Sequence, residues 1–177
     1  MKELENMLYD SSRRCILLAV DVLEQKPELF NDMLSLCMES KYPMAMRAAR
    51  VIQFYCDKFP ETILNHIDYV IPLFIKTNVD GVKRSIMKIF IDRIDVNLIP
   101  DLGLVLSKCY DWLLSDKEPI AVRVYSLELI NKIALSEPDL FLELKIVIEQ
   151  MDFDNYPSLR YRTQRILKYL RKKEMLY

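Results

Sequence analysis

Glycine is almost absent from this sequence, since only Gly81 and Gly103 occur among its 177 residues. Tight β-hairpin turns need residues that adopt positive φ, as glycine does most readily, so the scarcity argues against a hairpin-rich β protein. Two glycines also cannot complete the glycine-rich loops with which dinucleotide-binding and P-loop proteins hold phosphates. The composition therefore favours an all-α chain without a nucleotide cofactor.

The sequence has one histidine, His66, and four cysteines that never form a Cys-x-x-Cys pair. Structural zinc sites use closely spaced pairs of Cys or His ligands, so we predict no metal site. Cys15, Cys37, Cys56 and Cys109 each lie within an apolar helical pattern, which is typical of reduced thiols packed as small hydrophobic groups. We expect His66 on the polar side of a helix, without the nucleophile motif that would make it a catalytic base.

Neither a strong net charge nor a long apolar run is present. Lys and Arg number 25 against 26 Asp and Glu, so no net field attracts the whole molecule to nucleic acid or to an anionic membrane. The longest apolar run, Tyr69–Ile75, is far shorter than the roughly 20 residues that cross a bilayer. The first residues, MKELENMLYD, lack the apolar centre of a signal peptide. We therefore predict a cytoplasmic protein without a membrane segment.

Proline marks the beginnings of helices in this chain. Seven of the eight prolines stand at or near the start of an apolar stretch with helical periodicity, where a missing N–H costs nothing. We predict ten helices, the first of them short, with connections of two to six residues. The expected ranges are 2–9, 11–25, 27–38, 43–58, 60–76, 81–94, 97–114, 119–135, 138–151 and 157–173.

Short strings recur along the chain at similar intervals. PMAMR at 43–47 is nearly the same as PIAVR at 119–123, and KPELF at 26–30 is close to EPDLF at 137–141. Alignment on one arginine in every second helix gives spacings of 33, 37, 39 and 37 residues. These arginines are Arg14, Arg47, Arg84, Arg123 and Arg160. Such a period is typical of two-helix repeats, in which neighbouring pairs bury each other's apolar faces.

The stretch 66–91 resembles a HEAT repeat. It has Pro72 in its first helix, Asn78 and Asp80 in the turn, and Arg84 in its second helix. The resemblance covers nearly the whole chain and implies an all-α, right-handed α-solenoid of about five antiparallel helix pairs, with residues 1–177 forming a single HEAT-like (armadillo-like) repeat domain. It also explains Pro72, because the first helices of HEAT-like units tolerate a proline that bends them. The resemblance is informative about fold and says little about function.

Two interpretations of the repeated arginines remain open. The structural one is a ladder in which each Arg pairs with an Asp or Asn in the turn of a neighbouring repeat. Asp116 and Asp154 precede Arg123 and Arg160 at a suitable spacing, whereas the first two repeats depart from it. The functional interpretation is a row of guanidinium groups that bind a ligand along a groove.

Positive charge collects near the C-terminus, where residues 160–173 contain seven Lys or Arg and no acidic residue. The candidate binding patch on this helix comprises Arg160, Tyr161, Arg165, Lys168 and Lys172. One interpretation is the polar outer face of a terminal capping helix, whose C-terminal dipole favours cations. The other is a binding site for an acidic partner or for the phosphates of nucleic acid.

Two further motifs point to structure rather than chemistry. Residues 152–155 begin like an EF-hand loop but lack the glycine at position six and the glutamate at position twelve, so we expect a turn that caps the last helix. Trp112 stands beside Asp111, and the chain is similar in architecture to HEAT-like DNA-alkylation-repair glycosylases, which use tryptophans and an aspartate in a basic groove. We expect Trp112 to serve helix packing instead.

The sequence thus favours a non-enzymatic protein–protein interaction or scaffold module, which binds an unknown protein or peptide on an extended helical surface. The alternative is a nucleic-acid-binding protein related in fold to those glycosylases, which the balanced charge and single tryptophan do not favour. A helical metabolic enzyme is a third, less supported hypothesis. Because only a short helix covers the N-terminal end, a homodimer is expected as well as a monomer.

Overall fold

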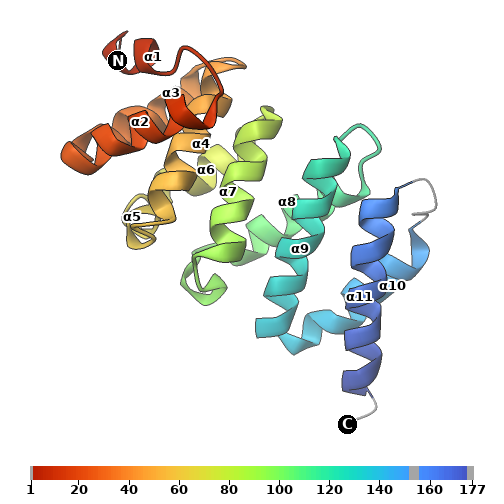
Figure 1. Cartoon of the computed structure of the whole chain (residues 1–177). Helices are drawn as coiled ribbons and strands as arrows, with labels where there is room; N and C mark the ends of the chain where they lie inside the picture. The colour runs from red at the N-terminus through yellow and green to blue at the C-terminus, as the bar shows by residue number, and fades with distance from the viewer. Residues whose placement is uncertain (1, 152–155, 175–177) are drawn as a thin grey trace. The chain divides into compact units, whose positions relative to one another are not determined.

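The computed structural model describes residues 2–151 and 156–174 of the chain. These residues form helices joined by turns, and no strand occurs among them (Figure 1). The prediction of an all-α chain is therefore confirmed. The chain divides into two compact units, Met1–Asp101 (unit 1) and Leu102–Tyr177 (unit 2), and each is described by itself.

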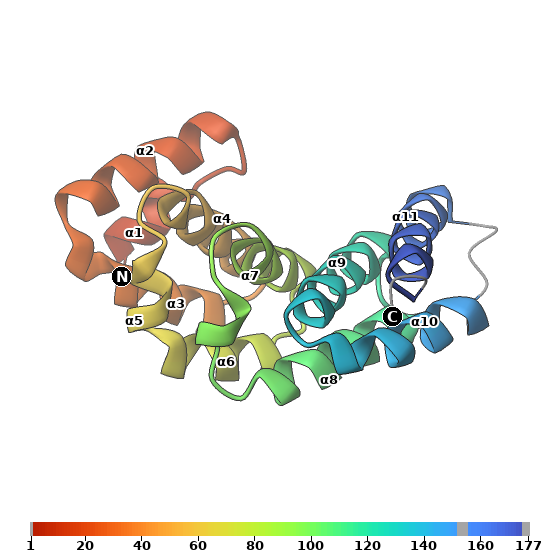
Figure 2. The same ribbon diagram turned by 90° about the horizontal axis from the view of Figure 1, so that it is seen from below.

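Unit 1 is built in two layers of helices. In Figure 2, α2, α4 and α7 lie in one layer and α3, α5 and α6 in the other. The central helix α4 packs against α2, α3 and α7, and α6 packs against α3 and α7. The elements are α1 (Lys2–Met7), α2 (Arg13–Gln25), η1 (Pro27–Leu29), α3 (Phe30–Glu39), α4 (Met44–Cys56), α5 (Glu61–Asn65), α6 (Ile67–Lys76), α7 (Asp80–Asp92) and η2 (Val96–Leu98).

The central position of α4 follows from its small side chains. Ala45, Ala48 and Ala49 are buried in its first half, and side chains of this size allow a neighbouring backbone to come close. The neighbour is α7, which begins with a buried glycine, Gly81. A Cβ atom built on Gly81 would lie 2.1 Å from Cγ and 2.7 Å from Cβ of Met46, so the close approach of α4 and α7 requires glycine at this position.

We expect Gly81→Ala to lower the free energy of unfolding by about 1–2 kcal/mol, because overpacking forces Met46 and the two helices apart. Gly103, in α8, is the matched control, since a Cβ atom there meets nothing within 4 Å. Gly103→Ala should stabilise the chain by a few tenths of a kcal/mol up to about 1 kcal/mol. Urea titration of both variants measures the difference, and a Gly81→Ala variant as stable as the wild type would contradict the close contact.

The prediction of one helix over 60–76 is wrong. The chain leaves helical geometry at His66, whose φ of −118° and ψ of 17° separate α5 from α6. The Nδ1 atom of His66 lies 2.8 Å from the carbonyl oxygen of Thr62, which a backbone N–H would occupy in a continuous helix. The imidazole also packs against Phe30 of α3, with ring centroids 4.8 Å apart. As predicted for HEAT-like first helices, Pro72 lies inside a helix, α6.

The prediction of one helix over 97–114 is also wrong, and Gly103 does not mark the interruption. Pro100 restricts Ile99 to extended geometry (ψ of 114°), and Asp101 adopts a positive φ of 51°, a conformation that Asp tolerates better than most residues. The short η2 therefore ends before Pro100, and the next helix begins at Leu102.

Unit 2 has two layers of two helices each. Its elements are α8 (Leu102–Leu114), α9 (Ile120–Ser136), η3 (Pro138–Leu140), α10 (Phe141–Gln150) and α11 (Pro157–Glu174). Figure 2 shows α9 and α11 in one layer and α8 and α10 in the other. The central helix α9 packs against all three others and buries residues on several sides, among them the polar Arg123 and Ser126.

Helix pairing agrees with the predicted repeat. The pairs α1–α2, α3–α4 and α6–α7 pack together within unit 1, as do α8–α9 and α10–α11 within unit 2. The right-handed sense of the array and the single domain over 1–177 stay predictions.

The EF-hand-like residues 152–155, including Asp154, lie outside the described residues. In the described part of the chain, no helix combines the length and the apolar character that crossing a membrane requires.

Candidate interaction surfaces

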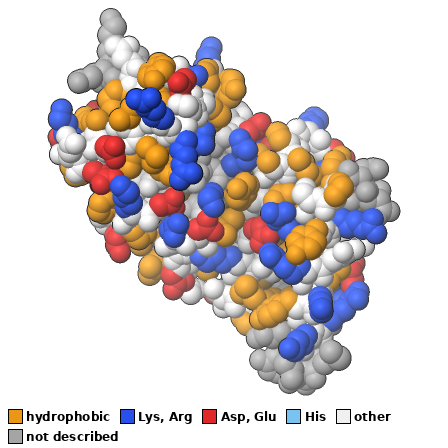
Figure 3. All heavy atoms as spheres, viewed as in Figure 1, with side chains coloured by type: hydrophobic (Ala, Val, Ile, Leu, Met, Phe, Trp, Pro, Cys, Tyr) orange, Lys and Arg blue, Asp and Glu red, His pale blue; other side chains and the backbone are white. Residues whose placement is uncertain are grey.

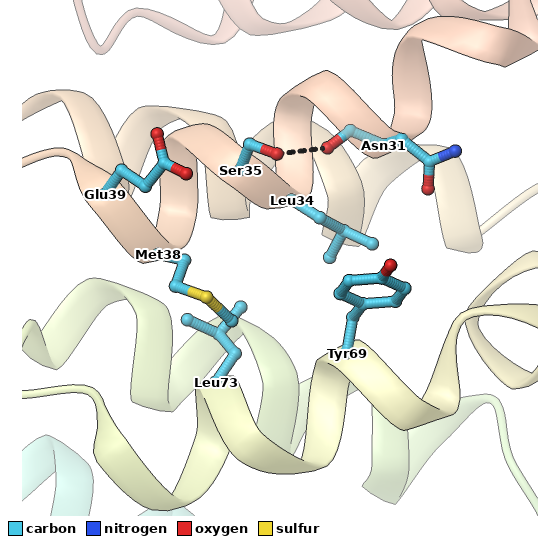
Figure 4. Close-up of a pocket in the computed structure, with 7 residues that line it drawn as sticks. All are labelled: Asn31, Leu34, Ser35, Met38, Glu39, Tyr69 and Leu73. Atoms are coloured by element: carbon cyan, nitrogen blue, oxygen red, sulfur yellow. Dashed lines mark hydrogen bonds between the residues drawn. The ribbon is translucent and has the colours of Figure 1, made fainter.

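A groove runs between α3 and α6 of unit 1. It consists of two adjoining pockets of about 370 and 240 Å³, which share Met38 and Leu73 as lining residues. The larger pocket is lined by Asn31, Leu34, Ser35, Met38, Glu39, Tyr69 and Leu73 (Figure 4). The smaller one is lined by Cys37, Met38, Ser40, Pro72, Leu73, Lys76, Thr77, Asn78 and Val79.

The groove exposes apolar side chains next to the polar side chains of Asn31, Ser35 and Glu39. Tyr69 is 63% exposed and Met38 is 50% exposed, whereas Leu34 and Leu73 lie buried between them. In Figure 4, Met38 of α3 lies against Leu73 of α6, and Tyr69 of α6 lies near Leu34 of α3. Glu39 and Asn31 lie at opposite ends of the labelled part of α3. Ser35 donates a hydrogen bond to the carbonyl oxygen of Asn31 at 3.1 Å, within its own helix.

Sequence reasoning did not identify this groove, although a signal for it was present. The run Tyr69–Ile75 is apolar over seven consecutive residues, so it covers the whole circumference of a helix. Only one side of α6 can face the core. Val70, Ile71 and Phe74 are buried, and Tyr69 is left on the outer face.

Arg47 binds backbone rather than a turn acid. Its Nη1 donates to the carbonyl oxygens of Leu8 at 2.8 Å and Tyr9 at 3.0 Å, and its Nε donates to the hydroxyl oxygen of Ser11 at 3.1 Å. These acceptors belong to the chain between α1 and α2. Arg47 therefore ties the first helix pair to the second, with carbonyl and hydroxyl acceptors where the ladder interpretation expected an Asp or Asn.

The other predicted ladder residues of unit 1 differ from Arg47. Arg14 is exposed in the first turn of α2. The Nε of Arg84 donates to the carbonyl oxygen of Asp80 in its own helix at 3.4 Å, and a carboxylate oxygen of Asp80 lies 3.7 Å from Nζ of Lys83. The three arginines of unit 1 thus occupy equivalent places in the sequence repeat but have different surroundings.

Arg123 of unit 2 is only 4% exposed. Its Nε donates to the carbonyl oxygen of Leu113 at 2.9 Å, and its guanidinium lies 5.1 Å from the ring centroid of Tyr156. Its Nη1 lies 3.5 Å from a carboxylate oxygen of Asp116, whose side chain is 91% exposed. The turn acid that the sequence indicated is near, but the main acceptor is the end of α8. Arg160, the last predicted ladder residue, is exposed on α11.

The predicted basic patch on α11 is partly neutralised by an acid on α9. Both carboxylate oxygens of Glu128 accept from Nη2 of Arg165, at 3.0 and 3.1 Å, and one of them lies 2.9 Å from Nε of Arg162. Tyr161 is 66% exposed, and Lys168 and Lys172 are exposed as well. Glu128 precedes Arg165 by 37 residues, so helical spacing within 160–173 could not reveal this pairing.

Trp112 and the four cysteines, which the sequence raised as candidates for catalysis or metal binding, are buried in the helical core. Trp112 is 4% exposed, whereas its neighbour Asp111 is exposed. All four cysteines are free and buried, and burial raises the pKa of Cys56 to about 12 and raises those of Cys37 and Cys109 further. Within the described residues, no group of three or more His, Cys, Asp or Glu is arranged to hold a metal ion.

Comparison with protein families gives one informative result. A family model described as a HEAT repeat domain matches residues 2–170, which is nearly the whole chain. Comparison with curated proteins and comparison with solved structures give no match. The matched range includes most of both units and reaches into every helix pair, so the resemblance noted in the sequence is confirmed. The chain belongs to the HEAT repeat domain family.

Proposed function

We propose that the chain is a non-enzymatic interaction module that binds a partner protein in the groove between α3 and α6 (Figure 4). The supporting observation is the pair of adjoining pockets, with exposed Met38 shared by both and exposed Tyr69 in the larger one. Aromatic and methionine side chains are enriched at the centres of protein interfaces, and tyrosines are frequent among the residues that carry most of the binding energy.

The chemistry of the groove specifies the kind of partner. The floor is apolar, with Leu34 and Leu73, and it runs between two helices, which suits an amphipathic helix that inserts one apolar side chain. Opposite charges border the groove, because Glu39 lines the larger pocket and Lys76 the smaller one. We therefore expect the bound helix to carry a basic residue toward Glu39 and an acidic residue toward Lys76.

Selection from a library of displayed amphipathic helical peptides tests this function. Selected peptides should share an apolar anchor, and fluorescence anisotropy should show that Tyr69→Ser with Met38→Ser weakens their binding at least tenfold, as expected for two central interface residues. Tyr161→Ser is the matched control, because Tyr161 is as exposed as Tyr69 but lies on the predicted α11 patch. It should bind the peptides as the wild type does.

The other outcomes count against the groove. Selected peptides that bind both variants equally would place the interface elsewhere, and loss of binding by Tyr161→Ser alone would favour the α11 patch. A library that yields no specific peptide would argue against a peptide-binding groove.

The nucleic-acid alternative gains no support from Trp112, whose burial prevents it from stacking on a base. A cytoplasmic location and a choice between monomer and homodimer stay predictions.

A further inference from the structure

A cluster of arginines surrounds one aromatic ring in unit 1. The guanidinium carbons of Arg13 on α2 and Arg50 on α4 lie 5.9 and 6.0 Å from the ring centroid of Phe54. Arg50 is held in place, because its Nη1 donates to the carbonyl oxygen of Ser11 at 2.8 Å. Arg14 follows Arg13 in the first turn of α2, and both are exposed. We call Arg13, Arg14, Arg50 and Phe54 the arginine cluster.

The arginine cluster has no acidic counterpart within the described side chains. Of the carboxylates whose side chains are described, none lies within 4.0 Å of the guanidinium nitrogens of Arg13, Arg14 or Arg50. The neighbouring acid, Asp10, accepts from the backbone N–H of Ser12 at 2.6 Å, and its hydrogen bonds to Ser12 lower its pKa. Neither α2 nor α4 has an acidic residue in its first turn.

Two other cations near this layer have acidic partners. Lys58 after α4 pairs with Glu24 of α2. Nε of Arg93 lies 2.8 Å from a carboxylate oxygen of Asp57, so this pair links the ends of α7 and α4. Lys58 and Arg93 are therefore compensated within the fold, whereas Arg13 and Arg14 are left exposed at the N-terminal end of α2. In Figure 3, Lys and Arg side chains lie among acidic and apolar side chains over α2 and α4.

The small area of the arginine cluster suits a short acidic peptide better than a nucleic acid. Arg guanidinium groups bind carboxylates with two parallel hydrogen bonds, and Phe54 holds two of them near one another. A nucleic acid would have to extend beyond this area along the same helices, where the exposed carboxylate of Asp21 would repel its phosphates. A few closely spaced carboxylates on a short peptide fit the cluster without meeting that acid.

We propose that the arginine cluster binds a short segment of a partner protein that is rich in Asp and Glu. This surface is separate from the α3–α6 groove and does not depend on it, because the cluster belongs to α2 and α4. The interaction is electrostatic, so it should weaken as salt rises.

A fluorescein-labelled peptide of eight alternating Glu and Asp residues tests the proposal, with full-length protein and anisotropy as the readout. We expect binding at 50 mM salt that weakens at 200 mM, and no binding of the matching Gln–Asn peptide. Arg13→Glu with Arg14→Glu should weaken binding at least tenfold. Lys26→Glu with Lys117→Glu makes the same change in net charge at two exposed lysines outside the cluster and should change binding less than twofold.

Arg13→Gln with Arg14→Gln removes the charges without reversing them, and circular dichroism establishes that each variant is folded. Loss of binding by this variant also supports the cluster. Equal binding by the Arg13→Glu, Arg14→Glu variant and the lysine control would overturn the proposal, since net charge alone would then explain the interaction. A 20-nucleotide single strand that binds more tightly than the peptide would overturn it in favour of nucleic acid. Failure of the peptide to bind at 50 mM salt would also overturn it, while leaving the α3–α6 groove untouched.

Discussion

Arg123→Ala is expected to lower the free energy of unfolding of unit 2 by about 3 kcal/mol. The substitution removes a charged donor from the carbonyl oxygen of Leu113, and hydrogen bonds of that kind contribute about 1.5–3 kcal/mol. It also removes the contact with the ring of Tyr156, worth about 0.5–2 kcal/mol, and the packing of the aliphatic stem. Asp116 contributes little, because its carboxylate remains exposed and solvated without its partner.

The only tryptophan of the chain makes this prediction measurable. Trp112 is buried in α8 of unit 2, so its fluorescence in a urea titration reports on that unit. Arg123→Lys keeps the charge but loses the planar group that reaches both Leu113 and Tyr156, so about half of the loss should remain. Arg171→Ala removes an exposed arginine 3.9 Å from Glu149 and should change stability by less than about 0.5 kcal/mol. An equal effect of Arg123→Ala and Arg171→Ala would show that burial of Arg123 contributes nothing.

The helix pairs could be predicted from the sequence, whereas the break at His66 could not. The prolines and the apolar spacing were enough to place most of the helices, because both signals are local: proline suits the first turn of a helix, and apolar spacing marks the buried face. The period of 33–39 residues then grouped the helices into pairs. Local signals failed at His66. There the imidazole packs against Phe30, 36 residues away in the sequence, and no window on α5 and α6 contains that contact.

The candidate sites were harder to predict for a related reason. A charge pattern on one helix reveals which side chains share a face, but it does not reveal their partners on another helix. Glu128 of α9 neutralises part of the α11 patch, whereas Arg13 and Arg50 come together from α2 and α4 around Phe54. Both facts depend on how helices pack, which the sequence of a single helix does not show.

Arg47→Ala is expected to destabilise the N-terminal part of unit 1 by about 2 kcal/mol. Three hydrogen bonds disappear, to Ser11 and to the carbonyl oxygens of Leu8 and Tyr9, and a charged donor to a carbonyl contributes about 1.5–3 kcal/mol even though water can reach part of this site. The acceptors all lie between α1 and α2. The loss should therefore appear first as local opening of this segment rather than as unfolding of the whole chain.

Amide hydrogen exchange tests where the loss occurs. An opening free energy lower by about 2 kcal/mol corresponds to exchange roughly thirtyfold faster, and we expect this increase over 4–15 with unchanged rates over 102–151. Arg14→Ala is the matched control, because Arg14 occupies the same place in the preceding repeat but is exposed; its effect should stay below about 0.5 kcal/mol. Equal effects of the two substitutions would support one uniform ladder, in which position in the repeat decides the role. Unequal effects would show that the repeat conserves the position of an arginine while each neighbouring turn decides what that arginine binds.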